Sequence, residues 1–526
     1  MEVPTTTSLE QIYPDEALPT QKRRCENLLS QFQTTYGRSP DFVSRSPGRV
    51  NLIGEHIDYS LYECIPMAVT ADVLLAVSVT TSKAGPSLVR IANTDSSKFP
   101  TRKFEIPSEG TISIDASSHE WTNYFKAGLL GASRVLGKSS DKAGHFMSVG
   151  MDILVDGSIP SGGGLSSSAA FVCASALAVM KANGEVKVDK KELVELAVVS
   201  ERAVGVNSGG MDQAASVLSL RGSALYVSFK PTLHSKAIKF PAAKSELTFV
   251  IAQSFVAADK HVTAPICYNL RVVECTLAAE VLSKIFGLKK PLPKDSGPLG
   301  VSLRGLQDAY FEEKEGIEDH TKASVSEFQQ QLERLVQLTK DHLTQEDGYT
   351  RRDIATILNT SVNEMNERYM STFPVSAERF LLRQRALHVF SEAIRVLKFM
   401  KLLSSPPPKD EDLLKGLGDL LDETQTSCRD LYDCSCPELD ELCQLARSAG
   451  AYGSRLTGAG WGGSSVHLVL ADKVEAVKRA WMRKYYKKRF PDITAEKLEK
   501  AIMVSKPGSG SSVFVLDGRP KLQVRG

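Results

Sequence analysis

The chain has 526 residues, of which 42% are apolar and 24% are charged, proportions that are typical of a globular protein and exclude the disordered, collagenous and membrane-spanning classes. Its 64 basic and 62 acidic residues nearly balance, to a net charge of +2, and this balance excludes the electrostatic footprint of a nucleic-acid-binding protein.

The N-terminal part is predicted to begin with a polar leader and one amphipathic helix within residues 1–38. Short β-rich runs then alternate with turns over about 42–105, and a helix is expected over 121–135. A strand is expected over 149–155, because apolar side chains alternate there. A glycine-rich turn follows this strand and leads into an apolar helix over about 169–181.

The remaining elements alternate between helices and short strands. They are expected to be a helix at about 190–205, strands near 223–229 and 247–253, a helix over 262–286, a charged helical segment over about 300–400, a loop at Pro406–Pro408, a strand over 465–470, a basic helix and a final strand near 512–516. This mixture predicts an α+β fold with two lobes. We expect the first lobe over 39–235 and the second over 236–526, with the helical segment inserted in the second.

The strand that ends near Ile53 leads directly into three ionisable residues, Glu55, His56 and Asp58. Carboxylates only accept hydrogen bonds, and two of them can bind neighbouring hydroxyls of a sugar. Arg49 projects from the same strand, just before these residues. The sequence therefore predicts a sugar-binding loop, and the alternative is a solvated polar loop.

A glycine-rich turn joins the strand over 149–155 to the apolar helix after it. Its central residues are Gly162, Gly163, Gly164, Leu165, Ser166, Ser167 and Ser168. Glycines let the backbone approach an anion closely, and the free N–H groups and dipole of a helix N-terminus favour phosphate. The turn lacks the lysine of a Walker A loop, so it predicts a phosphate-binding loop of another kind. The alternative is a flexible loop with a serine cap.

Two further segments add candidate residues. Glu201 precedes a pair of glycines that ends at Gly210, and Asp212 follows them at the start of a helix. Arg49 and Asp212 could supply the charge and the base of a phosphoryl transfer, with Glu201 and a serine holding a metal. An aspartate at a helix start is also a common cap. The second glycine-rich loop, over 457–464, is either another close-approach loop or a hairpin turn.

Nine cysteines, an odd number, are scattered along the chain, and this usage is typical of reduced cytoplasmic thiols. Cys434, Cys436 and Cys443 form the tightest group, but they lack the CxxC spacing and the nearby histidines of a zinc site. Buried thiols are therefore favoured over a metal site there. The N-terminus lacks the basic and apolar regions of a signal peptide, and no apolar run reaches the roughly 18 residues that span a membrane. A cytoplasmic location is expected.

Taken together, these segments resemble the GHMP family of small-molecule kinases. Residues 160–170 are similar to the second motif of that family, and residues 456–463 are similar to its third. Residues 48–59 are similar to the galactokinase signature, which other GHMP kinases lack. Residues 207–213 and 431–437 are similar to the fungal branch of the galactokinases. The resemblance covers most of the chain and implies two α+β lobes with nucleotide and sugar in the cleft between them.

The resemblance implies galactose and ATP as substrates, α-D-galactose 1-phosphate and ADP as products, and Mg²⁺ as cofactor, in the first step of galactose catabolism. Asp212 would be the catalytic base, and Arg49 the basic residue that faces it. Ser168 and Glu201 would hold Mg²⁺. The other implied contacts are with the sugar, at Arg49, Glu55, His56, Asp58, Gly210, Asp212 and Tyr268, and with ATP, at Trp121, Asn123 and each residue from Gly162 to Ser168.

Two alternatives remain open within the resemblance. The fungal branch contains a sugar- and ATP-binding transcriptional co-inducer that lacks a Ser-Ala pair in the phosphate loop, and the intact step from Ser168 to Ala169 favours an enzyme here. A kinase of N-acetylgalactosamine is the other alternative, which the wall around the second carbon of the sugar would decide. The resemblance also implies a monomer, with a galactose-pathway transcriptional repressor as the partner of a bifunctional protein, and neither nucleic acid nor membrane as a partner.

Overall fold

The structure is a computed structural model that describes residues 1–80, 86–107, 112–115, 118, 120–138, 148–205, 209–241, 247–256, 263–317 and 323–515. Its larger sheet has seven strands. In spatial order they are β1 (Thr5–Thr6), β15 (Ser512–Val515), β2 (Phe42–Ile53), β3 (Ile65–Thr80), β6 (Gly150–Gly157), β4 (Leu88–Asn93) and β5 (Arg102–Glu105). The long antiparallel hairpin of β2 and β3 is buried along nearly its whole length and forms the centre of the sheet.

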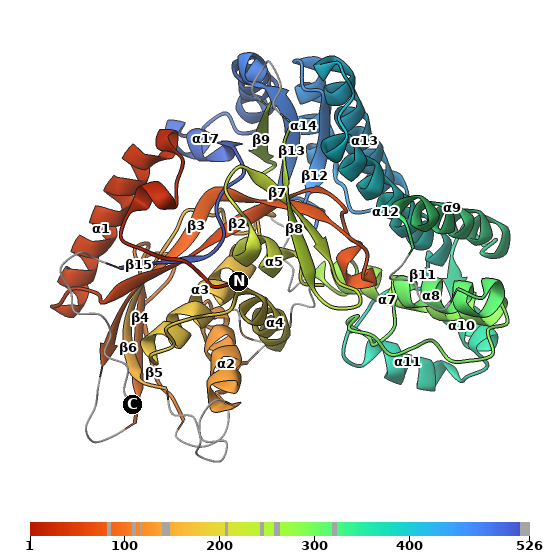
Figure 1. Cartoon of the computed structure of the whole chain (residues 1–526), viewed down its shortest axis with the longest axis horizontal. Coiled ribbons are helices and arrows are strands. Elements are labelled where there is room, and N and C mark those ends of the chain that lie inside the picture. Colours follow the sequence, from red (N-terminus) through yellow and green to blue (C-terminus); the bar gives the residue numbers. More distant parts are fainter. Residues whose placement is uncertain are drawn as a thin grey trace.

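Helices cover both faces of this sheet (Figure 1). On one face, α1 (Leu18–Tyr36) contacts β3 and β6. On the other face lie α2 (Asn123–Lys138), α3 (Ser167–Ala182), α4 (Lys190–Glu201) and α5 (Met211–Leu218). Because α3 contacts the sheet as well as α2, α4 and α5, it is buried on nearly all sides, which explains why its sequence has no polar stripe.

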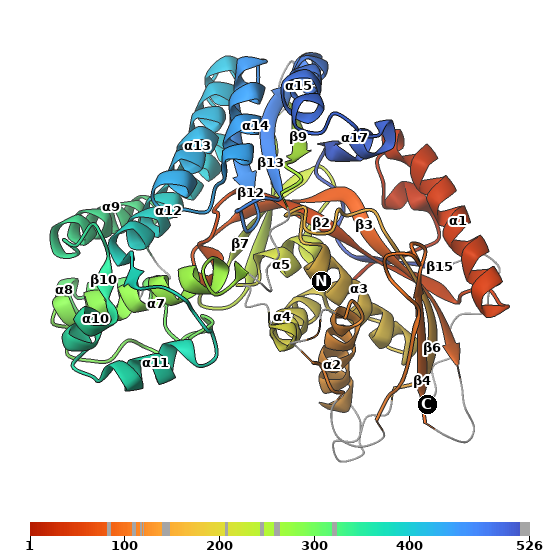
Figure 2. The same cartoon turned by 180° about the vertical axis from the view of Figure 1, so that it is seen from behind.

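The smaller sheet has four antiparallel strands. In spatial order they are β12 (Gly453–Thr457), β13 (Ser464–Leu470), β9 (Leu247–Gln253) and β14 (Ile502–Ser505). Three helices, α13 (Asp410–Asp430), α14 (Pro437–Ser448) and α15 (Val474–Trp481), lie beside this sheet (Figure 2). A separate hairpin of β7 (Ser223–Ser228) and β8 (His234–Lys239) contacts β3 and so continues the core of the first half.

The charged segment and the helix before it form a helical group at one end of the molecule, opposite α1 (Figure 1). It consists of α7 (Tyr268–Ile285), α8 (Leu303–Glu315), α9 (Val325–His342), α10 (Arg351–Leu358), α11 (Val362–Met370) and α12 (Leu382–Ser404), with a two-stranded ribbon of β10 (Tyr349–Thr350) and β11 (Arg379–Phe380). The long helix α12 contacts α7 and α9 on one side and α13 and β2 on the other. It therefore links the helical group to the strand that carries the first motif.

The α+β prediction is confirmed, as are the predicted helix near the N-terminus, the strand over 149–155 and the apolar helix after it. The sequence patterns missed β8, β12 and β14, which are short strands. They also did not show that β15 returns to the larger sheet, where it pairs with β1 and β2. Strand pairing between distant segments depends on tertiary contacts, which local patterns do not record. The lobe boundaries at 39–235 and 236–526 stay a prediction. Across the described ranges, no helix is both long and apolar enough to cross a membrane.

Candidate active site

Three loops meet at the backbone of Gly458. They are the acidic loop (residues 54–58), the first glycine-rich loop (residues 157–168) and the second glycine-rich loop (residues 457–464), to which Gly458 belongs. Its N–H donates to Glu55 Oε2 at 3.0 Å. Its Cα faces the carbonyl of Gly164 so closely that a Cβ would lie 2.4 Å from that oxygen. A glycine is required at this point, both for the approach and because the φ of Gly458 is +88°.

Two hollows open at this junction. A cleft of about 1250 Å³ runs between α1, the start of α3 and α17 (Ala495–Ala501). A smaller cavity is lined by Arg49, Glu55, His56, Asp58, Ser168, Glu201, Met211, Asp212, Tyr268, Gly458 and Ala459. Ser168, in the first turn of α3, lines both hollows, so the cleft and the cavity adjoin there. The structure thus brings the predicted base, acidic loop and metal ligands into one cavity.

Asp212 lies at the start of α5 and is held from two sides. Arg49 Nε donates to Asp212 Oδ1 at 2.7 Å, and the Ser166 hydroxyl donates to the other oxygen. Arg49 also donates through its second nitrogen to the Gly164 carbonyl at 2.7 Å. The guanidinium compensates the carboxylate charge, and the side chain of Asp212 stays 17% exposed toward the cavity. This arrangement suits a carboxylate that accepts a proton from a bound hydroxyl.

Glu55 is anchored by a buried ion pair. Arg455, from β12, donates to Glu55 Oε2, the same oxygen that accepts the N–H of Gly458. A second nitrogen of Arg455 donates to the Asn51 carbonyl at 3.2 Å. Among the described residues, both hydrogen bonds to the Glu55 carboxylate fall on Oε2, which leaves Oε1 for a ligand hydroxyl.

His56 is buried, with a φ of +59°, and both of its ring nitrogens have hydrogen-bond partners. Its Nε2 lies 2.9 Å from the Ala459 carbonyl oxygen, and its Nδ1 lies 3.0 Å from the Tyr59 hydroxyl. Burial opposes the charged ring, but contact with Cys434, the charge of Glu55 and the Ala459 carbonyl outweigh it and raise the pKa of His56. In turn, hydrogen bonding to Cys428 and His56 overcomes burial and lowers the pKa of Cys434 to about 6.

Asp58 is a buried acidic group whose pKa is raised. Burial and the neighbouring charge of Asp212 raise the pKa of Asp58 to about 6, and the Met211 N–H, 3.4 Å from Oδ2, opposes this only in part. Gly210 caps α5 with a φ of +111°, and this left-handed turn directs the Met211 N–H toward Asp58. Gly210 therefore shapes the cavity through its backbone and is not among its lining residues.

The residues of the first glycine-rich loop divide between two tasks. Gly162, Ser167 and Ser168 line the large cleft. Gly163 turns away, because its N–H closes a turn onto the Pro160 carbonyl and its own carbonyl accepts the Ser464 hydroxyl at 2.5 Å.

The other three residues predicted to contact ATP in this loop contact the protein itself. Gly164 and Leu165 offer their carbonyls to Arg49, the latter to its N–H at 3.1 Å, and the Leu165 side chain is buried. Ser166, with a φ of +57°, binds Asp212. The carbonyls and side chains of these residues hold the loop, and the phosphate contacts predicted for Gly163, Gly164, Leu165 and Ser166 stay a prediction.

Trp121 stands at the cleft among aromatic neighbours. It stacks on Phe171 with a ring separation of 6.0 Å and contacts Phe99 at 5.7 Å. Both neighbours also line the cleft, where the Phe171 ring is nearly parallel to that of Trp121, at 13°, and the Phe99 ring is tilted by 58°, so the three rings form an apolar wall. Asn123 was predicted beside Trp121, but it is buried, and its amide donates to the carbonyls of Asp115 and Ser118. Asn123 supports the loop before α2 instead of lining the cleft.

Ser168 and Glu201 face the small cavity from two helices, α3 and α4. The Glu201 carboxylate is buried and accepts a hydrogen bond from the Gln213 amide. Hydroxyl and carboxylate oxygens are the ligands that Mg²⁺ prefers, so the two residues fit the predicted ion. Among the described residues, His, Cys, Asp and Glu form no group of three that could hold a metal. Cys434 and Cys443 are buried and Cys436 is half-buried, and none of the three is in a disulfide.

Sequence reasoning missed several residues of the site. Arg455 is the most important, because it carries the buried positive charge that holds Glu55. A signal was present, since an arginine within the apolar strand before the second glycine-rich loop needs a buried partner. The aromatic partners Phe99 and Phe171 carried no such signal, because the sequence does not distinguish an aromatic residue that packs in a core from one that lines a cleft.

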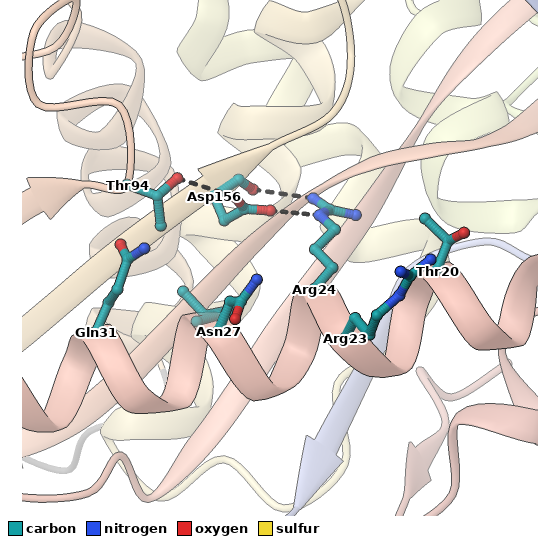
Figure 3. Close-up of a pocket in the computed structure, with 8 residues that line it drawn as sticks. Thr20, Arg23, Arg24, Asn27, Gln31, Thr94 and Asp156 are labelled. Carbon is teal, nitrogen blue, oxygen red and sulfur yellow. Dashed lines mark hydrogen bonds and ion pairs between the residues drawn. The ribbon is translucent and has the colours of Figure 1, made fainter. Parts of the chain in front are cut away.

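A further hollow of about 370 Å³ lies on the face of α1 and shares Arg24, Thr94 and Asp156 with the large cleft. Figure 3 shows Arg24 reaching from α1 to Asp156, which also accepts the Thr94 hydroxyl. Arg24 additionally pairs with Asp72 at 2.5 Å, so its charge is compensated within the protein. We assign this hollow no separate role.

Comparison with known proteins identifies the same segments. Residues 30–79 match the family model of the galactokinase galactose-binding signature, residues 124–219 the N-terminal domain of GHMP kinases, and residues 411–488 their C-terminal domain. Galactokinase from Saccharomyces cerevisiae is 44% identical over 504 residues, covering 94% of this chain and 95% of that protein. Galactokinase from Candida parapsilosis is 41% identical over 526 residues, covering 99% and 100%.

Among solved structures, Lactococcus lactis galactokinase in complex with galactose is similar to the chain with a TM-score of 0.63. The identity is 22%, and the match covers 93% of this chain and 99% of the other. This likeness concerns the fold, and the sequence matches above concern the family.

Proposed function

Because the chain belongs to the galactokinase family of GHMP kinases and is a sugar phosphotransferase, we propose that its two hollows carry out one reaction between them. The γ-phosphoryl group of ATP, bound in the large cleft, passes to the anomeric hydroxyl of D-galactose, bound in the small cavity. The products are α-D-galactose 1-phosphate and ADP. The observation that carries this proposal is that Asp212 shares the small cavity with the acidic loop, and that Ser168 joins this cavity to the cleft.

Asp212 acts as the base for the sugar hydroxyl. Its carboxylate accepts the proton while the sugar oxygen forms a bond to the γ-phosphorus and the bond from that phosphorus to the bridging oxygen of ADP breaks. Arg49 holds Asp212 in place and supplies positive charge next to the reacting atoms. Ser166, which donates to Asp212, orients its second oxygen.

Glu55, His56 and Asp58 select the sugar. The free Oε1 of Glu55 and the carboxylate of Asp58 accept hydrogen bonds from ring hydroxyls, and a sugar that lacks one of these hydroxyls leaves a buried acceptor unpaired. Tyr268 faces the same cavity from the start of α7 and contacts the His56 ring at 5.7 Å. Its aromatic face suits an apolar patch of the sugar ring.

The nucleotide lies along the cleft. Trp121 and Phe171 offer their rings to adenine, and the phosphates lie at the N-terminus of α3, where Ser167 and Ser168 begin the helix. Ser168 and Glu201 would hold Mg²⁺, which when bound offsets the negative charge of the triphosphate.

A coupled assay of ADP release with galactose, N-acetylgalactosamine, glucose and arabinose tests the proposal. We expect the highest kcat/KM for galactose, and turnover that is lost when Mg²⁺ is chelated. Higher kcat/KM for N-acetylgalactosamine would instead assign the chain to that sister activity. No turnover of any sugar would overturn the proposal.

The protein is further proposed to act as a monomer in the cytoplasm. All nine cysteines are free thiols, which is typical of a reducing compartment. A galactose-pathway transcriptional repressor stays a predicted partner. A pull-down with such a repressor, with and without galactose and ATP, tests this prediction, and light scattering measures the oligomeric state.

A further inference from the structure

The backbone of the acidic loop is held from behind by α12, a helix that carries none of the recognised motifs. Glu392, near the middle of α12, is fully buried. Its Oε1 accepts the N–H of Gly54 at 2.8 Å and the N–H of Glu55 at 3.1 Å. These are the two backbone donors at the entrance to the acidic loop, and one carboxylate oxygen binds both.

The second oxygen of Glu392 is also occupied. Oε2 accepts Arg395 Nε at 2.7 Å and the Thr424 hydroxyl at 2.9 Å. Burial opposes the charge of this carboxylate, but the charges of Arg395 and Arg455 and the Gly54 N–H outweigh it and lower the pKa of Glu392 to about 2. The group is therefore a permanent buried anion that binds loop and helix bundle together.

His388 holds the other side of the same residue. Its Nε2 lies 3.0 Å from the Glu55 carbonyl oxygen, and its Nδ1 lies 2.9 Å from the Ser427 hydroxyl. Burial lowers the pKa of His388 to about 3, so the ring is neutral. A carbonyl only accepts, so Nε2 carries the hydrogen and Nδ1 accepts from Ser427. Both the N–H and the C=O of Glu55 are thus bound to side chains of α12.

We infer that Glu392 and His388 are positioning residues for substrate, which fix the direction in which Glu55 presents Oε1 to the sugar. Gly54 has a φ of +100° and no side chain, so the backbone on either side of it has rotational freedom that Glu392 removes. Arg455 fixes the other carboxylate oxygen of Glu55. The helical segment over about 300–400 therefore serves the sugar site through α12. This inference rests on the proposed function, because it requires the acidic loop to bind the sugar.

The most direct variant is Glu392→Gln, which keeps the volume but has one acceptor oxygen in place of two. Its amide NH₂ must face either the two backbone N–H groups or Arg395 and Thr424. In either case an N–H donor of the amide faces a donor that Glu392 accepts, and that hydrogen bond is lost. We expect the KM for galactose to rise about tenfold or more, and the KM for ATP to stay within about twofold. Amide hydrogen exchange of the 54–58 backbone is expected to accelerate in the ligand-free protein.

A pair of variants at His388 separates hydrogen bonding from volume. His388→Gln retains a side-chain donor for the Glu55 carbonyl, and His388→Leu retains only bulk. We expect the KM for galactose to rise more in His388→Leu than in His388→Gln. A role in packing alone predicts the reverse order or no difference.

The matched control is Asp152→Asn. Asp152 lies on β6, and its buried carboxylate binds Arg38 and Arg90. In Figure 1, β6 lies in the part of the larger sheet that is far from the helical group. The substitution is expected to lower the free energy of unfolding and leave the KM for galactose unchanged. All variants are assayed well below the lowest midpoint of thermal unfolding, so that the folded fraction is equal.

The outcomes for the inference and for the proposed function differ. A wild-type protein that does not phosphorylate galactose overturns the proposed function, and unchanged amide exchange at 54–58 in Glu392→Gln overturns the inference whether or not the protein is active. With an active wild type, the inference also fails if Glu392→Gln leaves the KM for galactose unchanged, raises both KM values equally, or behaves as Asp152→Asn does.

Discussion

The acidic loop and the first glycine-rich loop face the same junction of cavity and cleft, but they are held there by opposite means. Side-chain charges hold the acidic loop: Arg455 binds the carboxylate of Glu55, and Glu392 binds its backbone. Backbone contact holds the glycine-rich loop, where a Cβ on Gly164 would lie 2.9 Å from the Thr457 carbonyl oxygen. One loop depends on buried ion pairs and the other on the absence of side chains.

This difference fits the ligand that we propose for each loop. A neutral sugar is recognised by the exact direction of a few acceptors, and buried charges with several hydrogen bonds fix such directions. A triphosphate is bound by N–H groups and a helix terminus, so its loop has to come close without obstruction. Substitutions that remove charge are therefore expected to affect the sugar, and substitutions that add a Cβ are expected to affect the nucleotide.

The largest expected effect is that of Asp212→Asn, which removes the proposed base where the two loops meet. Its kcat is expected to fall about 10²–10⁴-fold, since the amide cannot accept the proton. Galactose binding, measured by calorimetry, is expected to persist, because Glu55 and Asp58 are unchanged. A near-native kcat in this variant would show that Asp212 is not the base.

Gly458→Ala tests the backbone contact between the two glycine-rich loops. A Cβ there would lie 2.4 Å from the Gly164 carbonyl oxygen, so the loops must separate. We expect a loss of about 1–3 kcal/mol in the free energy of unfolding and a higher KM for ATP. Urea unfolding and initial rates measure the two.

Gly184→Ala is the control for this substitution. Gly184 has a φ of +89°, but no atom lies within 4 Å of a Cβ there. It is expected to lose only the cost of the left-handed conformation, about 1–2 kcal/mol, and to leave the KM for ATP unchanged. If both variants raise this KM alike, contact between the loops does not position the nucleotide.

Asp58→Asn tests the electrostatics of the acidic loop. The pKa of Asp58 is raised from 3.8 to about 6, so the folded protein favours the protonated carboxyl, and stability from this source is lost as pH rises between these values. In the absence of sugar, the variant is therefore expected to be more stable than the wild type well above pH 6, by roughly 3 kcal/mol, and equal to it below about pH 3.

Urea unfolding at pH 5 and pH 8 measures this difference, which should be larger at pH 8. Asp472→Asn, at an exposed position, is the control and should show no such trend. A variant at Asp58 that is less stable than the wild type at pH 8 would show that the ionised carboxylate stabilises the ligand-free loop.

The smallest expected effect is that of Trp121→Ala in the nucleotide cleft. Removal of the ring that stacks on Phe171 is expected to raise the KM for ATP about tenfold, with little change in the KM for galactose. Trp121→Phe retains an aromatic face and should fall between this variant and the wild type. Equal changes in both KM values would place Trp121 outside the adenine site.

The sequence by itself determined the local parts of this protein. The acidic loop, both glycine-rich loops and the helix start at Asp212 are contiguous motifs. Glycine permits the positive φ that the backbone has at Gly54, Gly164 and Gly458. The alternating strand over 149–155 and the apolar helix after it were equally clear, because periodicity is a local signal.

Only the tertiary structure decided which groups hold those motifs in place. Arg455 and Glu392 lie hundreds of residues from Glu55, and nothing in their own segments indicates that partner. In the same way, the Asn123 amide binds the loop before α2, and the Gly163 carbonyl accepts the Ser464 hydroxyl. Hydrogen-bond partners of buried groups are set by packing between distant elements, which no local pattern records.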